Sequence, residues 1–312
     1  MAAKIAPRGL ANLGNTCFFN SVMQNMVTMD DFSRGIQEET GIGAPLHENL
    51  RAFFREMRKP SSSKNSMSPS GVFNAVCKYH TRFRGGRQHD SHELLRAMLD
   101  SLREEKTRPP PVSKKGQRAI EKSGIVDRLF GGSFLNCVQC LKCKSVSLTT
   151  EAFMDISLAI SPPPGSSNNL KTNNNNNNNS MRNDGEIVRT QARRRAMVKD
   201  CPETLTIHLK RFAATARGFS KVGKHVSIPL QLDMAPYTIP KLGKIEDKPE
   251  PILYSLSGIV VHSGGMGGGH YVAYTRRDSS SWFYFSDRHY KDVKESSVLN
   301  AQAYVCFYKR VR

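Results

Sequence analysis

The chain has 312 residues and a formal net charge of +19 at pH 7, with 46 Lys plus Arg against 27 Asp plus Glu. Hydrophobic residues make up 38% of it, enough for a sizeable core, so the composition excludes wholesale disorder. No apolar run approaches the roughly 18 residues that a membrane helix needs. The first ten residues lack the apolar segment of a signal peptide, so we expect no export.

The seven cysteines form an odd set in a chain without a recognisable export signal. This argues against a disulfide scaffold and predicts reduced thiols in the cytoplasm, the nucleus or both. Reduced thiols are available for metal binding or for nucleophilic chemistry.

Helix periodicity dominates the first part of the chain. Apolar residues recur at helical spacing over residues 16–29 and 91–106, and shorter helices are predicted over 46–58 and 71–79. Stretches rich in Pro and Ser at 60–69, and in Pro and basic residues at 107–116, predict loops between packed segments.

The pattern changes after residue 130. Polyasparagine between residues 161 and 180 has no side chain to bury and follows three consecutive prolines, so we predict a disordered insert over about 161–185. Short, partly alternating β-type runs predict strands at 152–160, 204–212, 225–232, 254–262, 270–276, 282–286 and 303–310. A helical part followed by an antiparallel sheet is an α+β arrangement.

Cys17 is the candidate nucleophile, because it lies where a predicted loop ends and a predicted helix begins. A helix N-terminus favours thiolate over thiol, so we expect the pKa of Cys17 to be lowered. Gly14 suits a turn that a Cβ atom would block, and Asn12 and Asn15 are amide donors near the thiol, as an oxyanion site needs. The alternative is that Cys17 is a small buried hydrophobic residue.

His270 is the candidate base. It opens a predicted strand directly after the glycine-rich segment 263–269, which can move or let another backbone pass closely. On the following strand, Ser286 and Asp287 are candidates for the group that orients the imidazole. The alternative is a flexible hairpin with an incidental histidine.

Six segments then match one family in order. They are GLANLGNTCFFNSVMQNM (9–26), QHDSHELLRAML (88–99), LTIHLKRF (205–212), YSLSGIVVHSGGMGGGHYVAYTRR (254–277), WFYFSD (282–287) and AYVCFYKR (303–310). They resemble the boxes of the ubiquitin-specific proteases (ubiquitin carboxyl-terminal hydrolases, peptidase family C19). In detail they are most similar to the branch of ubiquitin carboxyl-terminal hydrolases 16 and 45.

This resemblance implies a papain-like cysteine protease built as a right hand. It implies one catalytic domain over residues 1–312, in which 8–130 form a mainly helical thumb and 131–312 form the fingers and palm. The ubiquitin tail would enter between thumb and palm and end at the nucleophile.

The resemblance also implies roles for single residues. Cys17 would be the nucleophile, His270 its general base and Asn12 the residue that stabilises the oxyanion. Most members carry Asp or Asn at the third triad position, where this chain has Ser286, and Asp287 matches the second acidic residue. The resemblance leaves open which of these two holds His270.

The implied substrate is ubiquitin joined through its C-terminal glycine. Acidic groups should line the approach of its basic tail, and glycines should make room for it. The positions that match tail contacts are Gln88, Asp90, Glu93, Gly268, Gly269 and Tyr271. For the two acidic residues the alternative is an ordinary preference for acids in the first turn of a helix.

Family members often hold a structural zinc ion in the fingers with two Cys-x-x-Cys pairs. Cys140 and Cys143 form one such pair, and the second pair is missing. Two thiolates do not complete a tetrahedral site, and Cys137 and Cys201 lack the family spacing. We therefore predict that the structural zinc has been lost, and that catalysis needs no cofactor.

The leading hypothesis is a deubiquitinating thiol isopeptidase that acts as a monomer. The alternatives are a silent ubiquitin-binding module and a protease for another ubiquitin-like modifier. The net charge raises a nucleic-acid binder as a further class, but no zinc-finger, RNP or helix-turn-helix signature supports it. Basic residues concentrate between 182 and 224, where they form a solvated face or guide the chain toward an acidic target.

Overall fold

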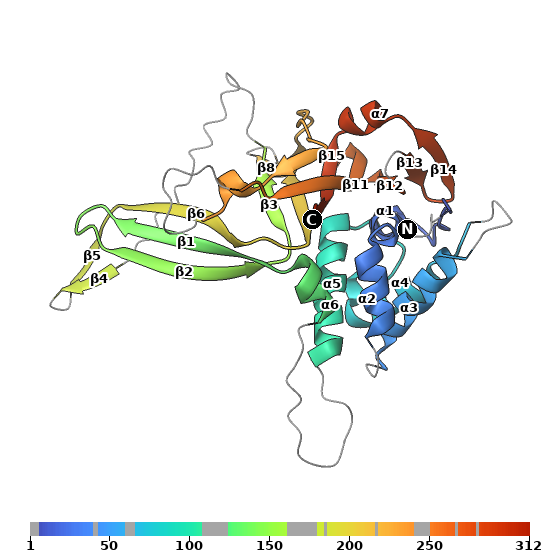
Figure 1. Cartoon of the computed structure of the whole chain (residues 1–312), viewed down its shortest axis with the longest axis horizontal. Coiled ribbons are helices and arrows are strands. Elements are labelled where there is room, and N and C mark those ends of the chain that lie inside the picture. Colours follow the sequence, from blue (N-terminus) through green and yellow to red (C-terminus); the bar gives the residue numbers. More distant parts are fainter. Residues whose placement is uncertain are drawn as a thin grey trace, which may run out of the picture.

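The computed structural model describes residues 6–39, 43–59, 66–107, 124–160, 180–183, 186–215, 218–239, 250–265, 268–278 and 281–312. Within these residues, a bundle of helices packs against one face of a large sheet, and a narrow second sheet projects away from both (Figure 1). No helix in this part of the chain combines the length and apolar character needed to cross a bilayer.

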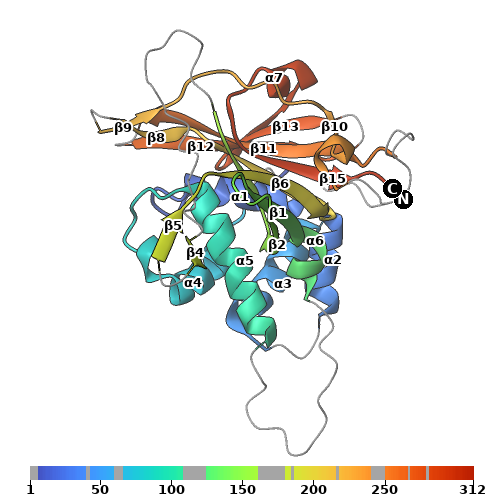
Figure 2. The same cartoon turned by 90° about the vertical axis from the view of Figure 1, so that its left-hand side faces the viewer.

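The helical part occupies the first 130 residues. Its elements are α1 (Cys17–Val27), α2 (Asp30–Glu38), α3 (Pro45–Met57), α4 (Ser70–Tyr79), the 3-10 turn η1 (Thr81–Phe83), α5 (Ser91–Thr107) and α6 (Ile125–Phe130). Figure 2 shows these helices gathered below the large sheet, with α1 nearest to it. This agrees with the thumb that the sequence predicted.

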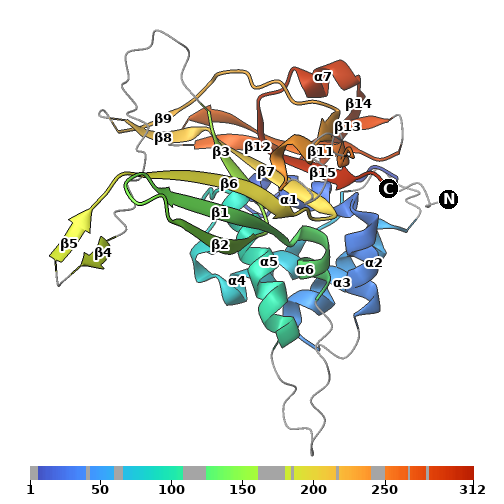
Figure 3. The same cartoon turned by 60° about the vertical axis from the view of Figure 1, so that its left-hand side comes forward.

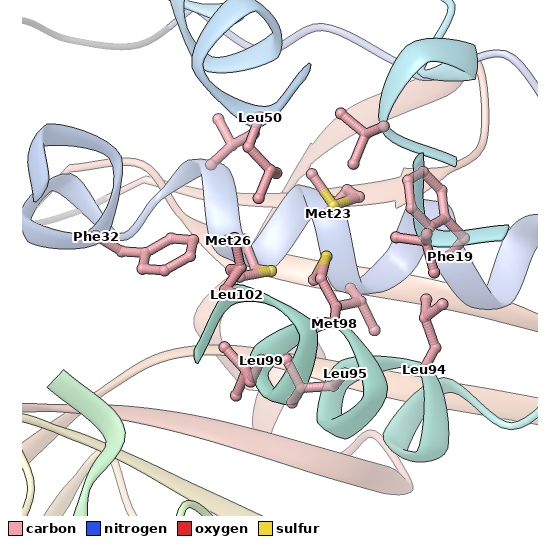
Figure 4. Close-up of a cluster of buried hydrophobic side chains, with 14 of the residues drawn as sticks. Phe19, Met23, Met26, Phe32, Leu50, Leu94, Leu95, Met98, Leu99 and Leu102 are labelled. Carbon is pink, nitrogen blue, oxygen red and sulfur yellow. The ribbon is translucent and has the colours of Figure 1, made fainter. Parts of the chain in front are cut away.

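Helix α1 is the centre of the molecule, since all eleven of its residues are buried. One side of it packs on strand β12 (Gly268–Arg276) of the large sheet. The opposite side faces α5, where Met23 and Met26 lie against Met98 and Leu102 (Figure 4). Burying apolar side chains on both sides fixes α1 between the sheet and the other helices.

The large sheet corresponds to the palm. Its strand order is β14-β13-β12-β11-β15-β7-β3, and β10 pairs with β11 off this path. Its strands are β3 (Ile156–Ala159), β7 (Thr204–Lys210), β10 (Gln231–Asp233), β11 (Leu253–Gly265), β12, β13 (Trp282–Ser286), β14 (His289–Val293) and β15 (Ala303–Arg310). The predicted antiparallel sheet therefore carries one parallel pair, β3 with β7.

The narrow sheet corresponds to the fingers. It has the order β2-β1-β6, from β1 (Gly132–Cys140), β2 (Val146–Phe153) and β6 (Ala192–Asp200). The small hairpin of β4 (Ser180–Asn183) and β5 (Glu186–Arg189) lies beyond its far end (Figure 3). Most residues of β2 and β6 are exposed, as expected for a sheet with little cover on its faces.

The remaining described elements are short. They are the hairpin of β8 (Phe212–Thr215) and β9 (Gly218–Lys221), the 3-10 turn η2 (Ala235–Tyr237) and α7 (Glu295–Leu299). The predicted insert at 161–185 lies outside the described residues, except for 180–183, which form strand β4 instead of a disordered segment.

One predicted strand is wrong. Residues 225–232 alternate like a strand, but only Gln231–Asp233 forms one, and residues 222–229 have no regular structure. Pro229 lacks the N–H that a strand ladder would use, and the carbonyl of this residue accepts a hydrogen bond from the Tyr308 hydroxyl instead.

Candidate active site

The loop before α1 is shaped by two residues with positive φ. Gly14 has φ +99° and Asn15 has φ +55°, which together turn the chain sharply into the helix. The side-chain amide of Asn15 donates to the carbonyl of Gly86 at 2.7 Å. The sequence predicted Asn15 as a donor near the thiol; in the structure one of its N–H groups anchors the loop to Gly86, and a role at the thiol stays a prediction.

Cys17 is the first residue of α1, as predicted, and only 2% of it is exposed. Burial raises the pKa of its thiol, the backbone N–H of Tyr271 opposes this rise, and the nearby charge of Asp287 adds to it. The expected lowering is therefore wrong for the free chain, since loss of solvent outweighs the helix N-terminus. The resting sulfur is a thiol, and a base must remove its proton.

His270 is the third residue of β12, directly before the residue whose N–H faces the sulfur of Cys17. The Nε2 atom of His270 lies 2.8 Å from the hydroxyl of Ser286, the last residue of β13. If Nε2 carries the proton and donates it to Ser286, then Nδ1 has a lone pair that can accept a proton. The sheet therefore places the imidazole one residue before the N–H that meets the Cys17 thiol, with Nε2 at Ser286.

Asp287 follows Ser286 in the turn between β13 and β14 and has φ +48°. One carboxylate oxygen accepts from the side-chain amide of Asn12 at 2.8 Å, and the other from that of Asn20 at 2.7 Å. The sequence left open which residue holds His270. Among the described contacts Ser286 bonds His270, while Asp287 joins two asparagine side chains.

The side-chain amide of Asn12 is fixed at both ends. Its oxygen accepts from the backbone N–H groups of Gly14, at 3.0 Å, and Thr16, at 3.1 Å. Its nitrogen donates one hydrogen to Asp287. Because the oxygen is committed to the loop, the nitrogen faces outward and its second hydrogen can be offered to a ligand.

The glycine-rich segment is a paired hairpin up to its tip. Gly264 pairs with Gly269 and Gly265 with Gly268, and only residues 266–267 lie outside the described part. The loop predicted to be mobile is therefore strand over most of its length. Gln88 fastens it from the helical side, because its amide donates to the carbonyl of Gly269 and accepts from the N–H of Gly269, each at 2.7 Å.

The predicted acidic residues already have partners. One oxygen of Asp90 caps α5 by accepting from the N–H groups of His92 and Glu93, at 2.8 and 2.9 Å, and the other accepts from the Tyr304 hydroxyl. Glu93 pairs with Arg82 at 3.2 Å on the surface. The predicted structural role of these acids is thus observed.

The remaining two predicted channel residues also lie beside this hairpin. Tyr271 is buried, and its ring lies 4.5 Å from that of His262. Gly268 is exposed at the end of the hairpin, opposite Gly265. Gln88 and Gly269 are thus bonded to each other, while Glu93 and Gly268 are exposed, and contact of the six residues with a ubiquitin tail stays a prediction.

The finger cysteines form an incomplete metal site. Cys140 ends β1 and its sulfur lies 3.4 Å from the Thr190 hydroxyl, while Cys143 lies 3.0 Å from the Ser145 hydroxyl. No group of three His, Cys, Asp or Glu suited to a metal occurs among the residues that the structure places. Two thiols and two hydroxyls do not fit a tetrahedral zinc site.

Sequence reasoning missed Asn20, which lies one turn after Cys17 and is 2% exposed. A signal was available, because polar residues within a helix that is otherwise apolar must find hydrogen-bond partners once the helix is buried. Asn20 and Gln24 both do so, Gln24 by donating to the carbonyl of Arg8 at 2.8 Å.

The comparisons with known proteins agree with this geometry. The family model described as "Ubiquitin carboxyl-terminal hydrolase" matches residues 8–308. The chain belongs to this family. The predictions of fold class and of a deubiquitinating cysteine protease are thereby confirmed, while the 16 and 45 branch stays a prediction.

Curated relatives match half of the chain or nearly all of it. Human ubiquitin carboxyl-terminal hydrolase 3 is 30% identical over 97% of this chain and 68% of its own length. Ubiquitin carboxyl-terminal hydrolase 1 of Arabidopsis thaliana is 40% identical over 50% of this chain, but the match covers only 15% of that protein. Some relatives are therefore much longer than this chain.

Solved structures share the fold. The yeast-type SAGA deubiquitinating module with Ubp8, Sgf11, Sus1 and Sgf73 bound to monoubiquitin matches with a TM-score of 0.79 and 22% identity, covering 100% of this chain and 71% of that chain. The same module bound to ubiquitin aldehyde matches with a TM-score of 0.76.

Proposed function

We propose that this chain is a thiol isopeptidase that hydrolyses the bond after the C-terminal glycine of ubiquitin, with Cys17 as nucleophile. One observation carries the proposal: the thiol of Cys17 meets the N–H of Tyr271, directly after His270, whose imidazole is held by Ser286 at 2.8 Å. A cysteine and a histidine so placed form an activated nucleophile.

The reaction begins with proton transfer from the Cys17 thiol to Nδ1 of His270. The sulfur attacks the carbonyl carbon of the terminal glycine, and Asn12 donates to the oxygen that becomes negative, together with backbone N–H groups at the start of α1. Protonated His270 then gives its proton to the leaving lysine amine. This leaves a thioester on Cys17.

Water completes the cycle. His270 removes a proton from a water molecule, the hydroxide attacks the thioester, and Cys17 leaves with a proton returned by His270. Ser286 keeps the imidazole in the tautomer that both steps need. Every proton is carried by these side chains, and the proposed steps use no cofactor.

Ubiquitin is the partner that the family and the ubiquitin-bound neighbours favour. We place its tail along Gln88, Asp90, Glu93 and the glycines of the β11–β12 hairpin, ending at Cys17. The basic tail would then have to compete with Arg82 for Glu93. Raised KM for a Glu93→Ala variant would support this path, and an unchanged KM would contradict it.

The deciding experiment uses ubiquitin carrying a C-terminal electrophile. We expect one covalent adduct on the intact chain, located at Cys17 by mass spectrometry, and none on Cys17→Ala. An adduct that survives this substitution would overturn the nucleophile assignment. If the intact chain forms no adduct and hydrolyses no ubiquitin substrate, the result would instead favour a silent ubiquitin-binding module.

Repeating the reaction with electrophiles on other ubiquitin-like modifiers tests substrate class. Faster labelling by one of them would show that this modifier, and not ubiquitin, is the preferred substrate.

We further propose that the chain works as a monomer in a reducing compartment, the cytoplasm or the nucleus, because oxidation of Cys17 would stop the reaction. Sedimentation equilibrium tests the monomer, and imaging of the tagged chain in cells tests the compartment.

A further inference from the structure

Asn20 occupies a position that the reaction described above leaves without a role. It lies on α1, one turn beyond Cys17, and is 2% exposed. Its side-chain nitrogen donates to the carboxylate of Asp287 at 2.7 Å and to the carbonyl of Ala11 at 3.2 Å. It therefore contacts both the loop that carries Asn12 and the turn that carries Ser286.

The carboxylate of Asp287 bridges two amides. Its second oxygen accepts from Asn12 at 2.8 Å, so the order of contacts is Asn20, Asp287, Asn12. A carboxylate has only acceptors, so it orients both amides with their nitrogens toward it. Asp287 adopts φ +48°, in the left-handed region where Asp is enriched among non-glycine residues, as befits its place in the tight turn after β13.

We infer that Asn20 is a positioning residue for the oxyanion donor, an inference that rests on the proposed function. Asn20 sets the carboxylate of Asp287, and Asp287 sets the amide of Asn12 so that its second N–H points to the reacting carbonyl oxygen. The same contact ties the helix that carries the nucleophile to the turn after β13. A small displacement of Asn20 would thus move the Asn12 amide through the carboxylate of Asp287.

The competing explanation is that Asn20 only satisfies a buried polar position. Asn25 provides a matched control, because it lies on the same helix, is 1% exposed, and donates to the carbonyls of Ser21, at 2.9 Å, and Ile259, at 3.3 Å. Among the described contacts, it touches neither Asp287 nor Asn12. Asn20→Ala and Asn25→Ala therefore each remove one buried amide, and only the first touches the oxyanion donor.

The test measures hydrolysis of a fluorogenic ubiquitin substrate at saturation. We expect kcat of Asn20→Ala to fall about tenfold to a hundredfold with little change in KM, less than the loss of a donor itself. We expect Asn25→Ala to lower the unfolding midpoint while kcat stays within about twofold. Equal kcat losses in the two variants would overturn the positioning role.

A charge exchange keeps the test independent of stability. Asn20→Asp places two carboxylates together, and Asp287→Asn turns a donor toward one of the two amides, so each single variant should lose kcat. In the double variant Asp at 20 accepts from Asn at 287, whose oxygen still accepts from Asn12. We expect it to recover at least fivefold over either single variant, and purely additive losses would contradict the inference.

A second probe distinguishes an effect on oxyanion stabilisation from an effect on the reactivity of the Cys17 thiol. Ubiquitin with a C-terminal propargyl amide reacts with the thiol at an alkyne carbon and forms no tetrahedral oxyanion. Asn20→Ala should therefore keep most of its labelling rate while losing hydrolysis, and parallel losses would overturn the inference. If the intact chain neither labels nor hydrolyses, the proposed function fails. In that case NMR tests the positioning role by itself. The side-chain amide resonances of Asn12 should shift in Asn20→Ala but not in Asn25→Ala.

Discussion

At the scale of single residues, two thiols of this chain lie in opposite environments. Burial raises the pKa of Cys17, and the charge of Asp287 adds to the rise. Cys140 is at the end of β1, where the hydroxyl of Thr190 and the N–H groups of Cys143 and Lys142 lower its pKa to about 6. The catalytic candidate is thus protonated at neutral pH, while the finger thiol is ionised.

This difference predicts the order of alkylation. Because iodoacetamide reacts with thiolates, labelling of Cys140 should reach half its maximal rate near pH 6 and level off above it. Labelling of Cys17 should still be rising above pH 9. Peptide mass spectrometry after short pulses between pH 5 and about 10 measures both. Faster labelling of Cys17 than of Cys140 at pH 7 would show that its burial is relieved in solution.

The hydrogen bond between His270 and Ser286 gives a second prediction. A side-chain hydrogen bond of this kind typically contributes about 1 kcal/mol of net stabilisation. Ser286→Ala should therefore lower kcat roughly five- to tenfold. Ser257→Ala is the control, because that serine also gives up one hydrogen bond, to the carbonyl of Phe307, without facing the imidazole. If both variants keep full activity, another group orients His270.

At the scale of elements, the β11–β12 hairpin places glycines where two neighbours approach closely. A Cβ atom on Gly269 would lie 2.2 Å from Nε2 of His262 and 2.4 Å from the carbonyl oxygen of Ser263. On Gly265 it would meet nothing within 4 Å, and its φ is not in the left-handed region. The two glycines therefore differ although they lie on the same hairpin.

We expect Gly269→Ala to push β12 away from His262 of β11 and to break the two bonds of Gly269 with Gln88. Ubiquitin hydrolysis should then fall at least tenfold in kcat/KM, because the hairpin borders the proposed tail path. Gly265→Ala should stay within about twofold of the intact chain. A tolerated Gly269→Ala would indicate that the hairpin can move without cost.

The sequence predicted some elements well for physical reasons. Helix α5 buries a regular apolar face, so the prediction of 91–106 differs from Ser91–Thr107 by one residue. Strands β1 and β6 were not predicted, because the narrow finger sheet covers little of either face and three exposed arginines follow the first residue of β6. Without one buried face, no alternating pattern marks such strands.

The site was predictable only in part. Cys17, His270 and Ser286 could be named from the motifs; the structure bonds His270 to Ser286 and brings the N–H of the next residue to the Cys17 thiol. For Asn20 the sequence marks a buried polar side chain but not its partner, because Asp287 lies 267 residues away and no local pattern marks that contact. The pKa of Cys17 was also mispredicted, since the helix N-terminus is local while burial depends on the whole fold.

At the scale of the whole molecule, the arginine cluster of the fingers is separated from the site. Arg193, Arg194 and Arg195 are exposed on β6 of the projecting fingers, and Arg194 donates to Asn136 at 3.1 Å. The site lies instead between α1 and the palm sheet (Figure 1). The charge of these three arginines therefore lies away from the nucleophile, as a solvated face or as a guide to acidic targets.

Two stacked imidazoles join the thumb to the palm. His92 of α5 and His208 of β7 have ring centroids 3.8 Å apart with an interplanar angle of 14°. His92 also bonds Asp155 at 2.9 Å, and the Nδ1 atom of His208 lies 2.9 Å from the Ser157 hydroxyl. Burial, followed by the proximity of His92, lowers the pKa of His208 to about 4.

The sign of the resulting pH dependence follows from proton uptake. An unfolded histidine titrates near about 6.5, so below that pH the unfolded chain binds a proton that folded His208 refuses. The free energy of unfolding should therefore fall as the pH drops from 6.5 to about 4, and stay level from this cause above 6.5. Urea unfolding at several pH values measures the slope. In His208→Asn the slope should be shallower, whereas exposed His289→Asn on β14 should leave it unchanged; equal slopes in all three proteins would show that His208 accepts its proton without loosening the joint between thumb and palm.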